Sequence, residues 1–168
     1  MATPTTLPAS FTSGQILTAA NMNDIRGAFR ILQVVQGSTT TGASSSTTTY
    51  ADTGLTATIT PSSTSSKILI IAAQQGLRKT SANANNAIRL RLVRGSTAIH
   101  NIGNAILFSG TALEMRSSCT AVYLDSPNTT SATTYKTEFA NDSATAAVEV
   151  QSGGSSTEST IILCEVSA

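Results

Sequence analysis

The sequence predicts an all-β protein: an antiparallel β-sandwich of jelly-roll type, preceded by an extended N-terminal arm and one short helix. Charged residues make up only 11% of the 168 residues, well below the usual quarter. Ser and Thr, which favour turns and strands, carry much of the polar surface instead. Short alternations of apolar and polar residues recur between turn signals, a spacing typical of sandwiches and jelly rolls. No long helix alternates with them, which argues against a parallel sheet with crossover helices.

The arm occupies the first ten residues. Pro4 and Pro8 lie there among Thr and Ala, a composition that predicts an extended segment without a core of its own. This stretch lacks the basic and apolar regions of a signal peptide, so we expect synthesis in a cytoplasm. The longest apolar run, residues 68–73, is too short to span a bilayer, and no membrane insertion is expected.

The short helix is expected to begin after Thr18, whose hydroxyl can cap its first turn. Leu17 and Met22 have the spacing of a hydrophobic staple, and Met22, Ile25 and Phe29 fall on one face. A helix this short is marginal alone in water, so its apolar stripe needs a partner. That partner could be the chain's own β domain, another copy of the chain or a larger particle.

The remainder of the chain is expected to be strands and turns. Residues 37–49 have a Ser/Thr/Gly composition that indicates an edge strand interrupted by a loop. The run 68–73 is apolar on both faces, which places it at the centre of a sheet or under a covering layer. Strands are expected over residues 30–38, 55–60, 67–75, 86–94, 97–102, 105–109, 113–124, 133–140, 146–151 and 160–166. Their alternation predicts a core of Ile68, Ile70, Ile88, Leu90, Leu92, Val122, Leu124, Val148, Val150, Ile161 and Leu163.

No catalytic residue, cofactor or metal site is expected. His100 is the single histidine, and no acid stands beside it in the sequence to build a Ser-His-Asp or Cys-His arrangement. The acids are scattered singly, and the chain has no phosphate-binding loop, dinucleotide fingerprint or Ca²⁺ loop. Cys119 and Cys164 lie in separate strand-like segments. They are expected to be buried free thiols, with a disulfide between adjacent strands as the alternative.

A basic cluster is the one charge feature of the sequence. It could be the solvated outer face of a sheet, it could pair across a subunit interface with acids such as Glu114 or Glu138, or it could recognise an acidic host glycan. The net charge of +1 and the lack of interleaved aromatic residues predict no nucleic-acid partner. The cluster consists of Arg78, Lys79, Arg89, Arg91 and Arg94.

Several segments resemble bacteriophage tail-fibre and other virion-surface proteins. The run SGQILTAANMNDI at residues 13–25 is similar to their entry segment, in which a Gly, an L-T-A-A step and an Asn-rich helix precede a β domain. The resemblance continues in LQVVQG (32–37), YADTGLTATITPSSTSSKILI (50–70), YLDSPNTTSATTYK (123–136) and STIILCEVSA (159–168).

The resemblance implies a non-enzymatic structural protein of a bacteriophage virion, made in the host bacterial cytoplasm and assembled as a homotrimeric fibre or decoration subunit. Residues 1–36 would serve as the anchor and oligomerisation segment, and residues 37–168 would project outward as the β-sandwich. Partners would be other copies of the chain and the capsid, portal or tail proteins. The contact residues would be Leu17, Met22, Ile25 and Phe29.

The alternative function is that of a receptor-binding adhesin domain that recognises a host cell-surface carbohydrate. Such a site needs aromatic stacking platforms, and aromatic residues are only 4% of the chain. We therefore expect the structural role. The candidate platforms of an adhesin would be Tyr50, Tyr123 and Tyr135.

Overall fold

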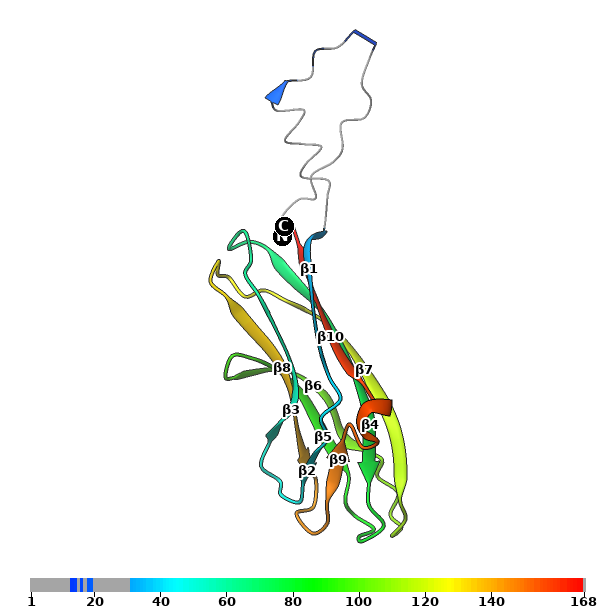
Figure 1. Ribbon diagram of the computed structural model, residues 1–168. Coiled ribbons are helices and arrows are strands. Elements are labelled where there is room, and N and C mark those ends of the chain that lie inside the picture. Colours follow the sequence, from blue (N-terminus) through cyan, green and yellow to red (C-terminus); the bar gives the residue numbers. More distant parts are fainter. Residues whose placement is uncertain (1–12, 15, 17, 20–30, 168) are drawn as a thin grey trace.

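The computed structural model describes residues 13, 14, 16, 18, 19 and 31–167, and Figure 1 shows that residues 31–167 form two sheets packed face to face. The all-β antiparallel sandwich expected from the sequence is confirmed. Only the first residue of the helix expected after Thr18, Ala19, is among the described residues, and the contact residues Leu17, Met22, Ile25 and Phe29 lie outside them.

The strands follow one another in this order: β1 (Ile31–Thr39), β2 (Ala43–Ser45), β3 (Ala51–Ile59), β4 (Lys67–Lys79), β5 (Ile88–Arg94), β6 (Thr97–Ile106), β7 (Met115–Asp125), β8 (Thr133–Asn141), β9 (Val148–Val150) and β10 (Ser159–Val166). A single 3-10 turn, η1 (Gly154–Ser156), separates β9 from β10. The expected strand 97–102 and the first two residues of the expected strand 105–109 are joined into β6, which passes through Gly103 with an irregular register, and residues 107–109 are not strand.

One sheet, here called sheet A, is centred on β4. This strand pairs with β7 along one edge, and with β10 and then β9 along the other. β1 continues the sheet beyond β10, and β2 continues it beyond β9. β1 and β2 therefore act as one edge strand interrupted by residues 40–42, as the composition of 37–49 predicted. Residues 31–36, expected as part of the N-terminal segment, belong to β1 and hence to the sandwich.

The other sheet, sheet B, has the order β3-β8-β5-β6, and all its pairs are antiparallel. When β1 is counted with β2 and β9 with β10, each sheet has four strands. Successive strands then alternate between the sheets, except where β5 turns directly into β6. Gly95 makes that turn with φ +59°, a conformation that glycine adopts without strain. This is the strand order of a jelly roll.

The core lies between the sheets as two apolar clusters separated by a polar layer. One cluster contains Ile70 and Tyr135, and the other contains Leu90 and Phe139. On β8 the polar Thr137 lies between the two aromatic residues. Four buried side chains form the layer and join sheet B to sheet A through hydrogen bonds, which satisfies polar groups that water cannot reach. They are Thr53, Thr137, Gln74 and Ser159.

The inward face of β7 was predicted incorrectly. Val122 and Leu124 are 61% and 52% exposed, whereas Ala121 and Asp125 are buried. The other nine residues expected in the core are buried. Because side chains alternate along a strand, one buried residue decides the face of all the others. That residue is Asp125, whose carboxylate accepts from the Tyr135 hydroxyl at 2.7 Å and from Arg94 Nη1 at 2.8 Å.

Candidate interaction surface

The outer face of sheet A is apolar at the end where β1 begins. The strand register aligns Val34 on β1 with Cys164 on β10, Leu69 on β4 and Leu124 on β7, so one apolar row crosses all four strands. The next row has Gln36 at the β1 edge and is otherwise apolar. We call the following set the apolar face: Leu32, Val34, Leu69, Ile71, Val122, Leu124, Ile162 and Cys164.

The two inner strands of this face are apolar on both sides. On β4, Ile68 and Ile70 point into the core while Leu69 and Ile71 point outward. A strand with this pattern is usually buried on both faces. The expectation that 68–73 lies at the centre of a sheet is confirmed. Within the part of the chain that the structure describes, nothing covers its outer side, and Val34 and Val122 remain 60% and 61% exposed.

The size of the face sets it apart from scattered surface hydrophobes. Four strands about 4.8 Å apart and two outward rows about 6.8 Å apart span roughly 19 by 14 Å, or about 260 Å². A contiguous patch of a few hundred Å² is comparable with the largest apolar patch of an ordinary monomer, which is often functional. The apolar face is therefore the strongest candidate for a functional surface.

Charged groups border the face at the opposite end of sheet A and are already paired. Arg78 contacts Glu149 at 3.0 Å and Glu114 at 2.6 Å, and Arg116 contacts Glu114 at 2.9 Å. Hydrogen bonds from Arg78 and Arg116 lower the pKa of the Glu114 carboxyl. Two cations and two anions cancel here, so this border carries no net charge toward a partner.

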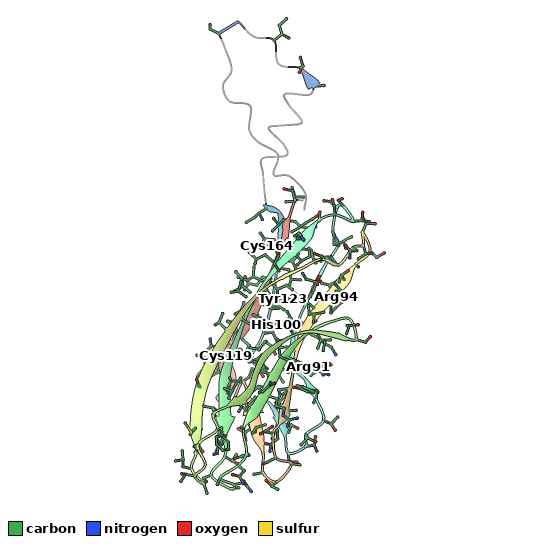
Figure 2. The ribbon with its side chains drawn as sticks, turned by 180° about the vertical axis from the view of Figure 1, so that it is seen from behind. Arg91, Arg94, His100, Cys119, Tyr123 and Cys164 are labelled. Carbon is green, nitrogen blue, oxygen red and sulfur yellow. The ribbon has the colours of Figure 1, made fainter. Side chains whose placement is uncertain are left out.

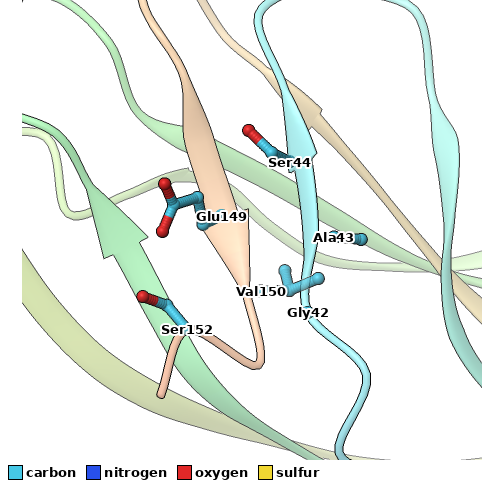
Figure 3. Close-up of a pocket in the computed structure, with 6 residues that line it drawn as sticks. All are labelled: Gly42, Ala43, Ser44, Glu149, Val150 and Ser152. Atoms are coloured by element: carbon cyan, nitrogen blue, oxygen red, sulfur yellow. The ribbon is translucent and has the colours of Figure 1, made fainter. Parts of the chain in front are cut away.

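A small hollow lies beside this network on sheet A. Figure 3 shows its lining, in which Glu149 points to the same side as Ser44 and Ser152. Glu149 is the only titratable group in the lining, and it is paired with Arg78. The hollow therefore lacks the second acid or base that hydrolytic chemistry requires. Its other lining residues are Gly42, Ala43 and Val150.

Sheet B presents the opposite character on its outer face. Arg91 pairs with Glu138 at 2.6 Å, and Lys136 contacts both Glu138 and Asp52. The Arg91 guanidinium also lies 3.8 Å from the centre of the Tyr50 ring, a cation–π arrangement. Ion pairs and hydrogen bonds thus cover this face, in contrast to sheet A.

The five residues of the predicted basic cluster do not form one patch. Arg78 lies on sheet A, Arg89 and Arg91 lie on sheet B, and Arg94 closes one end of the sandwich beside Asp125. The acids considered as partners across an interface, Glu114 and Glu138, pair with Arg78 and Arg91 of the same chain.

Lys79 is buried, although the sequence placed it in the exposed cluster. Its ammonium donates to Ala84 O at 2.9 Å, Ser109 Oγ at 2.6 Å and Thr111 O at 3.1 Å. It therefore ties together the loops that follow β4 and β6. Its inward direction follows from the alternation with Leu77 on β4, a signal that the sequence does contain.

Glu165 is a second buried charge that the sequence analysis did not single out. Its carboxylate accepts from Ser62 N at 2.7 Å, Ser62 Oγ at 2.6 Å and Gln33 Nε2 at 2.6 Å. Burial alone would raise the pKa of this carboxyl, but the hydrogen bonds from Ser62 and Gln33 outweigh it and lower the pKa to about 2. Glu165 thereby holds the loop between β3 and β4 against β1, directly beside the apolar face.

The remaining candidate groups are engaged in packing. Figure 2 shows His100 against Tyr123, and their rings stack with centroids 4.9 Å apart. Both Cys119 and Cys164 are free thiols, and burial raises the pKa of Cys119. Across residues 31–167 and the few described before them, no three His, Cys, Asp or Glu side chains gather to hold a metal ion.

The three tyrosines expected as sugar platforms are also occupied. Tyr135 is fully buried, Tyr123 stacks on His100, and Tyr50 lies under Arg91. An exposed aromatic ring occurs instead at Phe108, in the turn after β6, which the sequence analysis missed.

No protein-family model matches the chain, and no curated protein has a similar sequence. The described helices include none that is long and apolar enough to cross a membrane.

Proposed function

We propose that the chain is a non-enzymatic structural protein of a bacteriophage virion. It would form a homotrimeric fibre or decoration subunit, held to the particle by its N-terminal segment, residues 1–36, with the β-sandwich projecting outward. The observation that carries this proposal is the apolar face of sheet A. A sandwich with this surface needs a covering layer, and Leu32 and Val34 place the surface where the N-terminal segment joins β1.

The segments that resemble virion-surface proteins support the proposal, because they supply most of the apolar face. Leu32 and Val34 lie in LQVVQG, and Leu69 lies near the end of the segment 50–70. Leu124 lies in the segment 123–136, and Ile162 and Cys164 lie in the segment 159–168. The likeness therefore includes part of each of the four strands that build the candidate interface.

The assignment of a non-enzymatic role is supported by how the reactive groups are used. His100 stacks on Tyr123, and both Glu114 and Glu149 bind Arg78. Glu165 is fixed by Ser62 and Gln33. Each of these groups has a structural partner that would have to be given up for catalysis.

Labelling of purified particles tests the proposed function. The full chain would carry a C-terminal epitope tag, be expressed during infection, and be detected on intact particles by immunogold imaging and by mass spectrometry of the purified virions. We expect label at one kind of site on the particle surface. Absence from purified particles, or turnover of a bacterial surface polysaccharide that a single Asp or Glu variant abolishes, would contradict the proposal.

A further inference from the structure

We propose that β7 accepts an extended strand of a different protein, which adds to sheet A through backbone hydrogen bonds. The binding site is the free edge of β7, the side that faces away from β4, along residues 117–124. This inference goes beyond the proposed function and does not depend on the virion assignment. The occupant is an uncharged segment with aliphatic side chains at alternate positions, rather than a second copy of the chain.

The backbone of β7 offers a row of hydrogen-bonding groups that an extended chain can satisfy. Within residues 31–167, β7 pairs with β4 alone. In an antiparallel pair, every second residue points its N–H and C=O away from the partner strand. Figure 1 shows β7 along the border of the sandwich, so these groups face outward from the edge of sheet A. Such a row is a template for another strand, and a sugar, a lipid or a helix does not match its repeat.

The other edges of the sandwich are protected against strand addition. β1 lies so close to β3 that a Cβ at Gly37 would overlap the Thr56 carbonyl oxygen. β3 has a break in register between Asp52 and Thr56, and β6 has three breaks in its pairing with β5. β2 is only three residues long. Bulges, short strands and close cover are the usual means by which sheets prevent an edge from pairing with another chain.

β7 lacks these protections over most of its length. Its register with β4 is unbroken from Cys119 to Asp125. Residues 117–124 contain no charged residue and no proline, the residue types that usually block an edge strand. At 11 residues, β7 is also longer than β1, β3 or β6. It is therefore the edge at which another strand can add most readily.

Side chains on both faces of β7 are incompletely covered. On the outer face, Val122 and Leu124 are more than half exposed. On the inner face, Cys119 and Tyr123 are only half-buried, although Ala121 between them is buried. An added strand would lie about 4.8 Å beyond β7. Its side chains would cover residues on both faces at once.

The order of side chains along β7 indicates what the partner strand contains. The outward residues change from the polar Thr120 to the apolar Val122 and Leu124. On the paired side, β4 matches this order. Its residues opposite these three are Ala73, Ile71 and Leu69. Because apolar cross-strand pairs stabilise a sheet, a partner strand with the same order of small and then aliphatic residues fits the free edge.

A second copy of β7 does not provide this order. Antiparallel pairing of two copies over their full length would place Val122 opposite Ser118 and Leu124 opposite Arg116. The register that sets Val122 opposite Leu124 of the other copy leaves only residues 121–125 in the ladder. The side chains of β7 therefore select a different strand over its own copy.

A peptide that copies residues 67–75 of β4 is the probe, because it has the required order of side chains. Fluorescence anisotropy would measure its binding to the full chain. One form of the labelled peptide is N-methylated at alternate residues, which leaves one edge able to form hydrogen bonds, and a second form is N-methylated at every residue. We expect saturable binding of the first form and none of the second. Hydrogen exchange should slow at every second amide of residues 119–125 when the first form is bound.

A charge on β7 tests the position of the bound peptide. Val122→Asp alters an exposed residue that points away from the core, so the sandwich should stay folded. It removes an apolar cross-strand pair and should weaken peptide binding about fivefold. Asn101→Asp is the matched control, because Asn101 is exposed on β6, an edge strand of sheet B. This variant should bind the peptide as the wild type does, and equal affinity of all three proteins would contradict binding at β7.

Three other results would overturn the proposal. The first is the absence of saturable binding. The second is equal binding of the fully methylated peptide, which would show that side chains alone hold the peptide on the apolar face. The third is slow exchange of the β7 amides in the free chain that increases with protein concentration, because a second copy would then occupy the edge. The presence of the protein on particles, which tests the proposed function, is measured separately and is unaffected by these results.

Discussion

Replacement of Glu165 by Gln should make the sandwich less stable at neutral pH and remove part of its sensitivity to acid. The carboxylate accepts two hydrogen bonds from Ser62 and one from Gln33, and it lies between β1, β10 and the loop that joins the two sheets. An amide in its place would direct an NH₂ group at one of these donors, leaving that donor without an acceptor.

The magnitude follows from the lowered pKa. A fall from the ordinary value near 4.5 to about 2 corresponds to at most about 3 kcal/mol of folding free energy, at 1.36 kcal/mol for each pKa unit. Since the folded-state pKa is depressed, this contribution is complete above the unfolded-state pKa near 4.5 and disappears as the pH falls toward 2. We expect Glu165→Gln to lose about 2–3 kcal/mol at pH 7 but only about 1 kcal/mol at pH 3.

Urea unfolding at pH 7, 5 and 3 would measure this difference for the wild type and for two variants. Glu158→Gln is the matched control, because Glu158 is exposed, and its stability should follow that of the wild type within about 0.5 kcal/mol. A gap between the wild type and Glu165→Gln that stays constant from pH 7 to pH 3 would refute the reasoning. The carboxylate would then contribute through its shape rather than its charge.

Three further changes have defined expectations. Leu90→Ala should cost roughly 2–5 kcal/mol in a denaturant melt because Leu90 is fully buried, and a loss below about 1 kcal/mol would contradict its place in the core. Lys79→Met should remove the ammonium donor of the Ala84 carbonyl, whereas Thr111 O keeps the donors Ser109 Oγ and Leu113 N. Faster hydrogen exchange in residues 107–113 would reveal the loosened loop, and unchanged exchange would show that the ammonium does not hold it. Ile25→Asp should reduce incorporation into particles by placing a charge in the anchor contact, whereas the melting of the sandwich should be unchanged.

The sequence predicted the sandwich well where alternation was clear and a strand had one apolar face. In β5 the apolar residues Ile88, Leu90 and Leu92 point to the same side of the strand, and all three are buried. In β7 apolar residues occur on both sides of the strand. Val122 and Leu124 are more apolar than the alternate set, yet that set faces inward because Asp125 binds Arg94 across the sandwich. Such a contact joins distant strands and leaves no local signal.

The candidate surface was only partly predictable. The run 68–73, apolar on both faces, indicated either the centre of a sheet or a place under a covering layer, but not which strands would extend the surface beside it. That depends on the register, which aligns Val34 with Leu69 through Cys164. The basic residues were grouped by their closeness in the sequence, although strand pairing sends Arg78 and Arg91 to opposite outer faces. Lys79 and Glu165 could have been assigned to the interior, because each points to the same side of its strand as a buried leucine two residues earlier.

The most direct test of the account is an image of the protein on intact particles at a resolution that separates strands. The account predicts three sandwiches around one axis. The apolar face of each copy would be covered, and the charged face of sheet B would be turned to solvent. An image that lacks these sandwiches, or in which the face from Val34 to Leu124 is open to solvent, would contradict it.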